Sequence, residues 1–352
     1  MRAPSEQQAL QQIPRRLADL LGLAPNDAKI RRQMGGALNA DAVVGLGGFT
    51  FIVQWTGSGT IARVSDAARQ AQEQASTAGK RAIPVVAVPF MGPAGRERCE
   101  ELTVGWLDLS GNARLVAPGL RVQMEGQPNR YKSPGRPATA FAPKSSRIAR
   151  WLLMHPGQPL TQRELATATK MDEGFTSRIV AKLEFDGLID REENGRIRAR
   201  DPNLLLDAWA ESYSFTKHRI LRGHIPARTA EAQLRAMTEV LAKKRQPYAA
   251  TGLAAAWLLD RFAGFRIVTI YLASEPEAPL LEQLGFREAE PGANTWLVVP
   301  NDEGVFQGAS DHDGVRCVHP VQVYLDLKEH PERAKEAAEQ LRMDLLKWGA
   351  DD

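Results

Sequence analysis

The sequence has little cysteine and no long apolar run. Among its 352 residues only Cys99 and Cys317 are cysteines, which excludes a disulfide framework and a zinc cluster built on thiolates. The apolar run Ala82–Met91 (AIPVVAVPFM) has the length of a strand, far short of the roughly 20 residues that cross a bilayer. No apolar signal segment opens the sequence, so we expect a cytoplasmic protein with no membrane partner.

Familiar catalytic and phosphate-binding motifs are also missing. The Gly-rich stretches 45–48 and 57–59 are not followed by the Gly-Lys-Ser/Thr of a P-loop, and no nucleophile elbow, HExxH or GxGxxG occurs. A metal site could use His312, Cys317 and His319, but the neighbouring Asp-Gly pair and Gly308 favour a turn. We therefore expect no cofactor, no metal and no enzymatic activity.

Charge is unevenly distributed, although 43% of residues are apolar and the net charge is only +3. Residues 128–200 carry 14 Lys/Arg against 8 Asp/Glu, whereas residues 201–352 carry 17 against 23. A basic middle segment suits a polyanionic partner. The acidic C-terminal third is poorly suited to phosphate contacts.

The middle of the chain predicts three helices in close succession. Residues 145–157 (SSRIARWLLMHPG) predict the first, with Ser145 or Ser146 as its N-cap. Thr161-Gln-Arg-Glu164 is a capping box that begins the second helix, and Asp172 caps the third. The third helix has an apolar stripe at Phe175, Ile179, Val180 and Leu183.

A basic hairpin follows the third helix. Asn194-Gly195 joins two strand-like runs, LIDREE and RIRAR, and this dipeptide is a strong hairpin signal. Arg196, Arg198 and Arg200 alternate along the second run, so they are expected on one strand face. The order of helices and hairpin over residues 145–200 resembles the winged helix-turn-helix.

This resemblance implies binding to double-stranded DNA, with the third helix in the major groove. At base edges or nearby phosphates we expect Thr176, Ser177, Arg178 and Lys182. On the DNA backbone we expect Arg163, Arg191, Arg196 and Arg198. The alternative is a protein–protein module, because winged helices also serve that purpose.

The segment upstream of the winged helix is rich in Pro, Ser and basic residues. Its composition is typical of a domain linker. Within it, Pro134-Gly-Arg-Pro137 is similar to the core of an AT-hook, in which an extended arginine enters the minor groove. On that hypothesis Lys132 and Arg136 extend the DNA footprint.

The N-terminal flank predicts an α/β domain. We expect two strands within 40–55, a helix over 62–79, a strand over 82–91, a helix from about Gly95, and a strand-turn-strand over 105–115. This order resembles the restriction-endonuclease-like fold, which holds a divalent metal with an Asp and with a Glu-x-Lys on the next strand. Asp41 matches that Asp, but Gln54 and Thr56 replace the Glu and the Lys.

A neutral amide and a hydroxyl are poor substitutes for the anionic ligand and the catalytic base, so the resemblance implies a site without nuclease activity. The stretch Asp108–Asn112 (DLSGN) resembles a strand-turn signature of regulators that join such a domain to a winged helix. The alternative is an ordinary turn with an Asx cap.

The C-terminal flank predicts a second α/β region. We expect an irregular lead-in and helix over Arg219–Lys243 and a helix over Thr251–Gly264. Three strands are expected at Arg266–Ala273, Asn294–Pro300 and Val318–Leu327. A last helix is expected over 329–348, with Pro331 near its start.

Tyr248–Gly252, Val321–Asp326 and the Glu/Ala-rich last helix resemble the C-terminal domain of AbiEi-type antitoxins. Those proteins repress their own operon and counter a nucleotidyltransferase toxin. One departure is that they are usually shorter and lack an N-terminal α/β domain.

The sequence thus predicts an α/β protein with a winged helix: an endonuclease-like domain over 1–127, a linker over 128–144, a winged helix over 145–212 and an AbiEi-like domain over 213–352. We expect a sequence-specific DNA-binding regulator, a repressor that acts as a homodimer, with a protein partner held by the C-terminal domain. The alternatives are an antitoxin-like partner of a nucleotidyltransferase and a metal-dependent nuclease with a migrated carboxylate.

Overall fold

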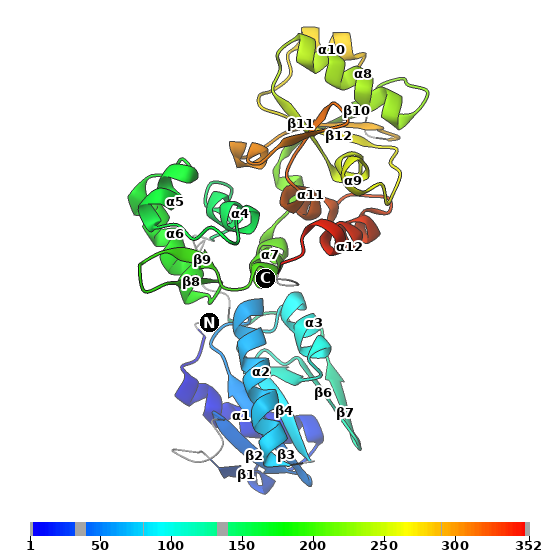
Figure 1. The fold of residues 1–352 in the computed structure, drawn as a ribbon. Helices are drawn as coiled ribbons and strands as arrows, with labels where there is room; N and C mark the ends of the chain where they lie inside the picture. The colour runs from blue at the N-terminus through cyan, green and yellow to red at the C-terminus, as the bar shows by residue number, and fades with distance from the viewer. Residues whose placement is uncertain (1–2, 32–39, 80, 132–139, 290, 349–352) are drawn as a thin grey trace. The chain divides into compact units, whose positions relative to one another are not determined.

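The computed structural model describes residues 3–31, 40–79, 81–131, 140–289 and 291–348. The chain divides into two compact units, of which the first comprises residues 1–139 and 183–188 and the second comprises 140–182 and 189–352 (Figure 1). No helix among the described residues combines the length and the apolar character needed to span a membrane.

The first unit contains a seven-stranded mixed sheet in the order β1-β2-β3-β4-β5-β6-β7. Strands β3, β4 and β5 are parallel, and the other neighbours are antiparallel. The predicted succession of strands and helices is confirmed. The elements are α1 (Glu6–Leu21), β1 (Lys29–Arg31), β2 (Ala42–Leu46), β3 (Phe49–Trp55), α2 (Ile61–Ala78), β4 (Ala82–Val88), α3 (Pro93–Glu101), β5 (Gly105–Asp108), β6 (Ala113–Ala117) and β7 (Leu120–Met124).

Helices cover both faces of this sheet (Figure 1). Val85 of β4 joins the buried cluster that contains Ile13 and Leu17 of α1. Val86, the next residue of β4, joins the cluster that contains Ala68 of α2. Since successive side chains of a strand point to opposite faces, β4 is apolar on both sides.

Helix α1 was not predicted, although its start carries a clear signal. Ser5 and Gln8 form a capping box, in which the Ser5 hydroxyl accepts from the Gln8 amide and the Gln8 side chain accepts from the Ser5 amide. Ile13 and Leu17, one turn apart, are fully buried. Pro14 lies inside the helix, and a proline usually argues against a helix interior.

The turn between β2 and β3 requires its two glycines. Gly47 and Gly48 have φ values of 59° and 80°, the left-handed conformation that both central residues of a type I′ hairpin turn adopt. The turn sets the register in which Ala42 faces Val53. It therefore brings Asp41, just before β2, next to the end of β3.

The winged helix follows in the chain, with residues 183–188 in the first unit and the rest in the second, and the predicted order of its elements is confirmed. They are α4 (Ser146–Met154), α5 (Gln162–Ala168), α6 (Glu173–Phe185), β8 (Ile189–Arg191) and β9 (Ile197–Ala199). The capping box of Thr161 and Glu164 forms at the start of α5. Asp172 caps α6 by accepting from the Phe175 amide at 2.7 Å. Leu160 forms an isolated bridge with Ile197, beside the two-stranded sheet of β8 and β9.

The rest of the second unit is built on another seven-stranded sheet, in the order β13-β10-β14-β12-β11-β16-β15. Helices α8 and α10 lie on one face, and α9, α11 and α12 lie on the other (Figure 1). The elements are α7 (Pro202–Ser212), η2 (Phe215–Lys217), β10 (Arg219–His224), α8 (Ala230–Lys243), β11 (Tyr248–Thr251), α9 (Gly252–Asp260), β12 (Val268–Leu272), α10 (Ala278–Leu284), β13 (Arg287–Glu288), β14 (Thr295–Val299), η3 (Glu303–Phe306), β15 (Ser310–His312), β16 (Val315–Cys317), α11 (Pro320–Leu327) and α12 (Ala334–Leu345).

Two predictions for this region were wrong. The expected strand over Val318–Leu327 is helix α11, which starts with His319 as N-cap and Pro320 at the first turn. Residues 321–327 are all buried, so the run carries no helical alternation of polar and apolar positions. The last helix begins only at Ala334, three residues after Pro331.

Two further segments were expected to be irregular and form strands. Arg219–His224 is β10, which pairs with both β13 and β14. The segment around Asp313-Gly314 was expected to be a loop, and it is a hairpin of β15 and β16 with that turn at its tip. A glycine-containing turn obscures short strands such as β15 and β16 in a sequence.

The C-terminal domain contains two buried histidines, His218 and His330, and a half-buried one, His319, that the fold keeps neutral. Burial lowers the pKa of His218, His319 and His330 from 6.5 to about 4. Asp326 behaves oppositely, because burial raises its pKa from 3.8 to about 6. Each histidine binds a proton more weakly in the folded chain, so its stabilising contribution is present above pH 6.5 and is lost as the pH falls toward 4.

We predict that acidification destabilises this protein between pH 6.5 and 4. Three histidines favour proton uptake by the unfolded chain and Asp326 opposes it, so the slope is at most about 3 kcal/mol per pH unit. Urea unfolding at pH 7, 6 and 5 measures it. The His330→Gln variant should have a slope lower by about 1.4 kcal/mol per pH unit, which corresponds to one proton. A slope equal to that of the wild type would contradict the assignment.

Candidate nucleic-acid interface

One face of α6 is buried in the winged-helix core, and it includes a residue that was expected to face outward. Thr176 is completely buried, as are Val180 and Leu183 one and two turns later. The Thr176 hydroxyl has no hydrogen-bond partner among the described residues. The expectation that Thr176 contacts DNA was therefore wrong, because its side chain belongs to the apolar stripe at i, i+4 and i+7.

The outer face of α6 is centred on Arg178. This side chain is exposed, and its guanidinium carbon lies 5.7 Å from the centre of the Phe175 ring. Ser177 is half-buried beside it, and Ala181 is exposed one turn further along. Lys182 is half-buried. Ala181 was not predicted, although a small exposed apolar side chain suits contact with a thymine methyl group.

Arg163 lies on α5, close to the start of α6. Its side chain is 85% exposed, and its Nε lies 3.4 Å from Glu173 at the first turn of α6. An ion pair between two exposed side chains contributes little to stability, so it leaves Arg163 available for a phosphate. The turn between α5 and α6 adds Lys170, an exposed residue with a φ of 54° that was not predicted.

The arginines of the hairpin are not equivalent. Arg198 and Arg191 are exposed on β9 and β8. Arg196 precedes β9 and is half-buried, and its guanidinium donates to the carbonyl oxygen of Pro159 at 2.8 Å. Arg196 and Arg198 flank the buried Ile197, as expected of residues on one strand face, but Arg196 anchors the hairpin to the loop before α5.

The net charge of residues 128–200 overstates how basic the winged helix within them is. Residues 142–197 carry nine Lys/Arg and eight Asp/Glu. Arg147 and Arg150 of α4 are buried, with 8% and 3% of their surface exposed, so neither can face DNA. Lys132 and Arg136 lie outside the described residues. A DNA surface here depends on a few well-placed arginines.

In the N-terminal unit, the ends of β2 and β3 bring together the residues that were aligned with a nuclease site. An oxygen of Asp41 accepts a hydrogen bond from the Trp55 amide at 2.7 Å, and burial raises the pKa of Asp41. Gln54 is buried, and the Thr56 hydroxyl donates to the Ser58 carbonyl. Across the described residues no group of three or more His, Cys, Asp or Glu side chains is placed to hold a metal ion.

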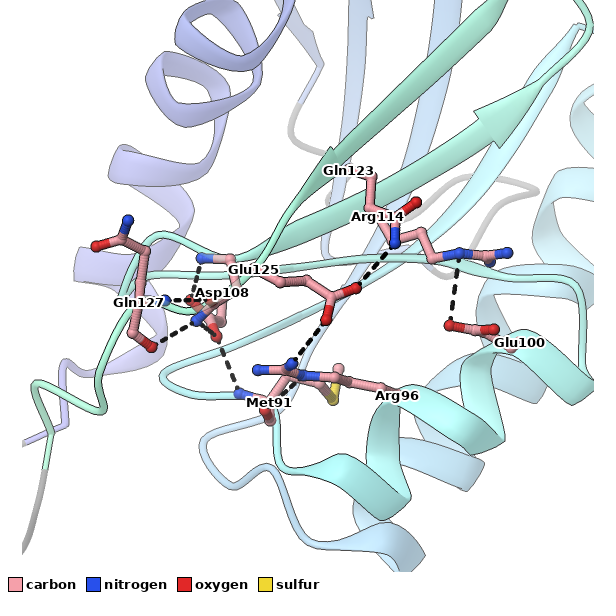
Figure 2. A network of polar contacts seen from close by, with 9 residues as sticks. Met91, Arg96, Glu100, Asp108, Arg114, Gln123, Glu125 and Gln127 are labelled. Carbon is pink, nitrogen blue, oxygen red and sulfur yellow. Dashed lines mark hydrogen bonds and ion pairs between the residues drawn. The ribbon is translucent and has the colours of Figure 1, made fainter.

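The DLSGN stretch forms a closed polar network around Asp108 (Figure 2). The buried Asp108 carboxylate accepts from the backbone amides of Met91, Gly111 and Asn112 and from the Asn112 side chain. Asn112 in turn exchanges hydrogen bonds with the backbone of Gln127, at 2.8 and 3.1 Å. Both oxygens of the Asp108 carboxylate therefore accept hydrogen bonds. Together with the bonds of Asn112, they hold the loop after β5 against the loop after β4 and against the segment after β7.

The geometry of residues 146–199 defines a winged helix-turn-helix: three helices, a bridging residue and a two-stranded hairpin, with an arginine on the outer face of the third helix. Two family models match this chain. Residues 142–197 match the MarR family, and residues 198–347 match the family described as transcriptional regulator, AbiEi antitoxin, type IV TA system. No curated protein and no solved structure matches the chain.

Residues 142–347 are therefore a DNA-binding winged helix joined to an AbiEi-type regulator domain, and the protein is a DNA-binding regulator. The resemblance to a winged helix-turn-helix and to AbiEi-type antitoxins was predicted from the sequence and is confirmed, whereas the MarR family was not predicted. The endonuclease-like interpretation of the N-terminal unit is supported by neither match and stays a prediction.

The burial of Thr176 leads to a test. Replacing Thr176 with Val keeps the shape and removes an unpaired buried hydroxyl, so the free energy of unfolding should rise by about 1 kcal/mol. DNA affinity should stay unchanged, because the side chain does not reach the surface. Urea unfolding and fluorescence anisotropy with labelled duplex measure the two quantities. A tenfold loss of affinity in a folded Thr176→Val variant would restore Thr176 to the interface.

Proposed function

We propose that this protein is a sequence-specific repressor of transcription that binds double-stranded DNA as a homodimer. The observation that carries the proposal is the outer face of α6, where Arg178 stands exposed between Ser177 and Ala181. In the major groove, an arginine pairs with guanine through two hydrogen bonds, and a hydroxyl accepts or donates to either type of base. Helix α6 is then the recognition helix.

Arg163, Arg191 and Arg198 flank α6 and supply the backbone contacts in this proposal. All three are exposed, and they lie on α5 and on the two strands of the hairpin. Phosphate contacts of this kind fix the register of a protein on DNA and make its affinity salt-dependent. Lys132 and Arg136 would extend these contacts along the minor groove.

The homodimer follows from the size of the binding site. One recognition helix reads only a few base pairs, and each base pair contributes about 1–3 kcal/mol of discrimination. Two half-sites on a two-fold axis double the sequence that is read. Repression needs only occupancy of a promoter, whereas activation also requires a surface that contacts the polymerase.

For the N-terminal unit we propose an endonuclease-like fold without nuclease activity, working in the cytoplasm as an added DNA or dimer surface. The pairing of β2 with β3 supports this, because it puts Asp41 beside Gln54 where such a site would lie. The Asp41 carboxylate is engaged by the Trp55 amide. Gln54 and Thr56 offer neutral groups where a divalent ion prefers anionic oxygens.

A second function, antitoxin activity, is favoured by the match of residues 198–347 to a family described as an AbiEi antitoxin. On this proposal the C-terminal domain binds a protein partner, a nucleotidyltransferase. Repression and partner binding are compatible, since they use different domains of the chain.

The proposal predicts that the full chain shifts DNA from upstream of its own gene to a discrete band in a native gel. The band should survive competitor DNA and should weaken steeply with salt, by about 10³–10⁵ in affinity between about 50 and 200 mM for roughly 6–10 phosphate contacts. The DNA should stay intact with Mg²⁺ as with EDTA.

The Arg316→Ala variant serves as a control for the loss of any one exposed arginine, because it removes such a residue from β16 and not from the winged helix. It should bind DNA like the wild type. A promoter–reporter fusion tests whether the protein represses or activates transcription, and repression should lower the output of the reporter. DNA shortened only in Mg²⁺ would contradict the assignment and indicate a nuclease. The absence of any shift would contradict DNA binding at this site and favour the protein partner.

A further inference from the structure

A short segment of the C-terminal domain, residues 302–308, lies directly against the winged helix. It follows β14 and contains the 3-10 turn η3. It contacts α4 at Arg147 and the end of α5 at Ala168. Both sides of this contact belong to the second compact unit.

The strongest contact is an ion pair between Arg147 of α4 and Asp302. The Arg147 Nε and Nη2 atoms each donate to a different oxygen of Asp302 at 2.7 Å. The two side chains are only 10% and 13% exposed. A two-point pair between planar groups fixes orientation as well as distance, so this pair sets how α4 lies on the segment.

Two further contacts reach the end of α5. Gln307 donates from Nε2 to the Ala168 carbonyl at 3.3 Å. Arg147 donates from Nη1 to the Thr169 carbonyl at 3.5 Å. The last carbonyls of a helix have no partner within the helix, and here they are bound by the C-terminal domain and by the arginine that it holds. Lys170, at the turn into α6, follows immediately.

The backbone of the segment approaches α4 so closely that glycine is required at one position. A Cβ atom on Gly304 would lie 2.6 Å from the Asp302 carboxylate and 2.9 Å from Cγ of Arg147. The Gly304 amide donates to the same Asp302 oxygen that binds Arg147, at 2.8 Å. The segment therefore has little freedom to shift while α4 and α5 stay in place.

We propose that residues 302–308 are a positioning element for the recognition helix. By holding α4 and the carbonyl end of α5, they fix the angle at which α6 presents Arg178 to DNA. Two hydrogen bonds to one base tolerate little error in angle, whereas phosphate contacts tolerate more. The C-terminal domain thus sets specific DNA affinity without touching DNA, and this inference rests on the proposed function.

The rival explanation is that the segment only stabilises the fold. Breaking a buried ion pair destabilises a protein in either case, so stability alone does not separate the two. The ratio of specific to non-specific DNA affinity separates the two explanations, because a folded domain with a tilted α6 keeps its phosphate contacts and loses its base contacts.

The test compares three variants of the full chain with the wild type. Asp302→Asn weakens the ion pair, and Gln307→Ala removes the contact with α5 without changing charge. Asp311→Asn is the control, because it removes an equally charged but exposed partner of Arg316. The probes are the duplex that the wild type enriches from a random-sequence library, and a scrambled duplex of equal length.

Asp302→Asn should lower affinity for the enriched duplex at least about tenfold, a loss equal to one mismatched base pair, and should change affinity for the scrambled duplex less than about twofold. Gln307→Ala, which is expected to fold, should lower the ratio of affinity for the enriched duplex to affinity for the scrambled duplex by about threefold. Asp311→Asn should leave the ratio unchanged. Circular dichroism and thermal unfolding establish that each variant is folded.

Unchanged ratios in folded Asp302→Asn and Gln307→Ala would overturn the inference and leave the proposed function standing. Equal losses for both duplexes would also overturn it, because they indicate a smaller folded fraction. If the wild type enriches no sequence, the proposed function fails and this inference fails with it.

Discussion

Burial of two arginines of α4 is the constraint on which the packing of α4 against the C-terminal domain depends. Arg147 and Arg150 are largely buried, and a buried guanidinium is tolerated only with hydrogen-bonding partners in place. Both find those partners in the C-terminal domain, at Asp302 and at Gln322. The winged helix and the C-terminal domain therefore share one polar interface.

The Arg150 side of this interface reaches deep into the C-terminal core. Arg150 donates to Gln322 at 2.6 Å, and Gln322 donates to Asp326 at 2.6 Å. Asp326 also accepts from Tyr213, Tyr271 and Thr251. Burial lowers the pKa of Arg150 and raises that of Asp326, so each group depends on the network for its charge. Such networks specify one arrangement more than they add stability.

The local signals of the sequence were enough to predict the winged helix. The capping box at Thr161 and the Asn-Gly turn at Gly195 depend only on neighbouring residues, and both formed as predicted. The interface of α4 could not be predicted, because Asp302 lies 155 residues from Arg147. Nothing near Arg147 distinguishes a buried arginine from one that faces DNA.

Errors at α6 and α11 have related causes. At α6 the apolar stripe was assigned through Phe175, but the turn of the helix buries Thr176 and leaves Phe175 half-exposed. At α11 the surrounding helices bury every residue of 321–327. Periodicity identifies a helix only when one face is solvated, so a helix buried all round is easily taken for a strand.

We propose that α6 reads base sequence while the hairpin binds the DNA backbone. The measurement that tests this most directly is the affinity of wild type, Arg178→Ala and Arg198→Ala for an enriched duplex and for each of its single base-pair substitutions. We expect that Arg178→Ala costs about 1–3 kcal/mol and abolishes preference at one or two positions, and that Arg198→Ala weakens binding to all duplexes equally and lowers the salt slope by about one. Unchanged base preferences in a folded Arg178→Ala variant would contradict it.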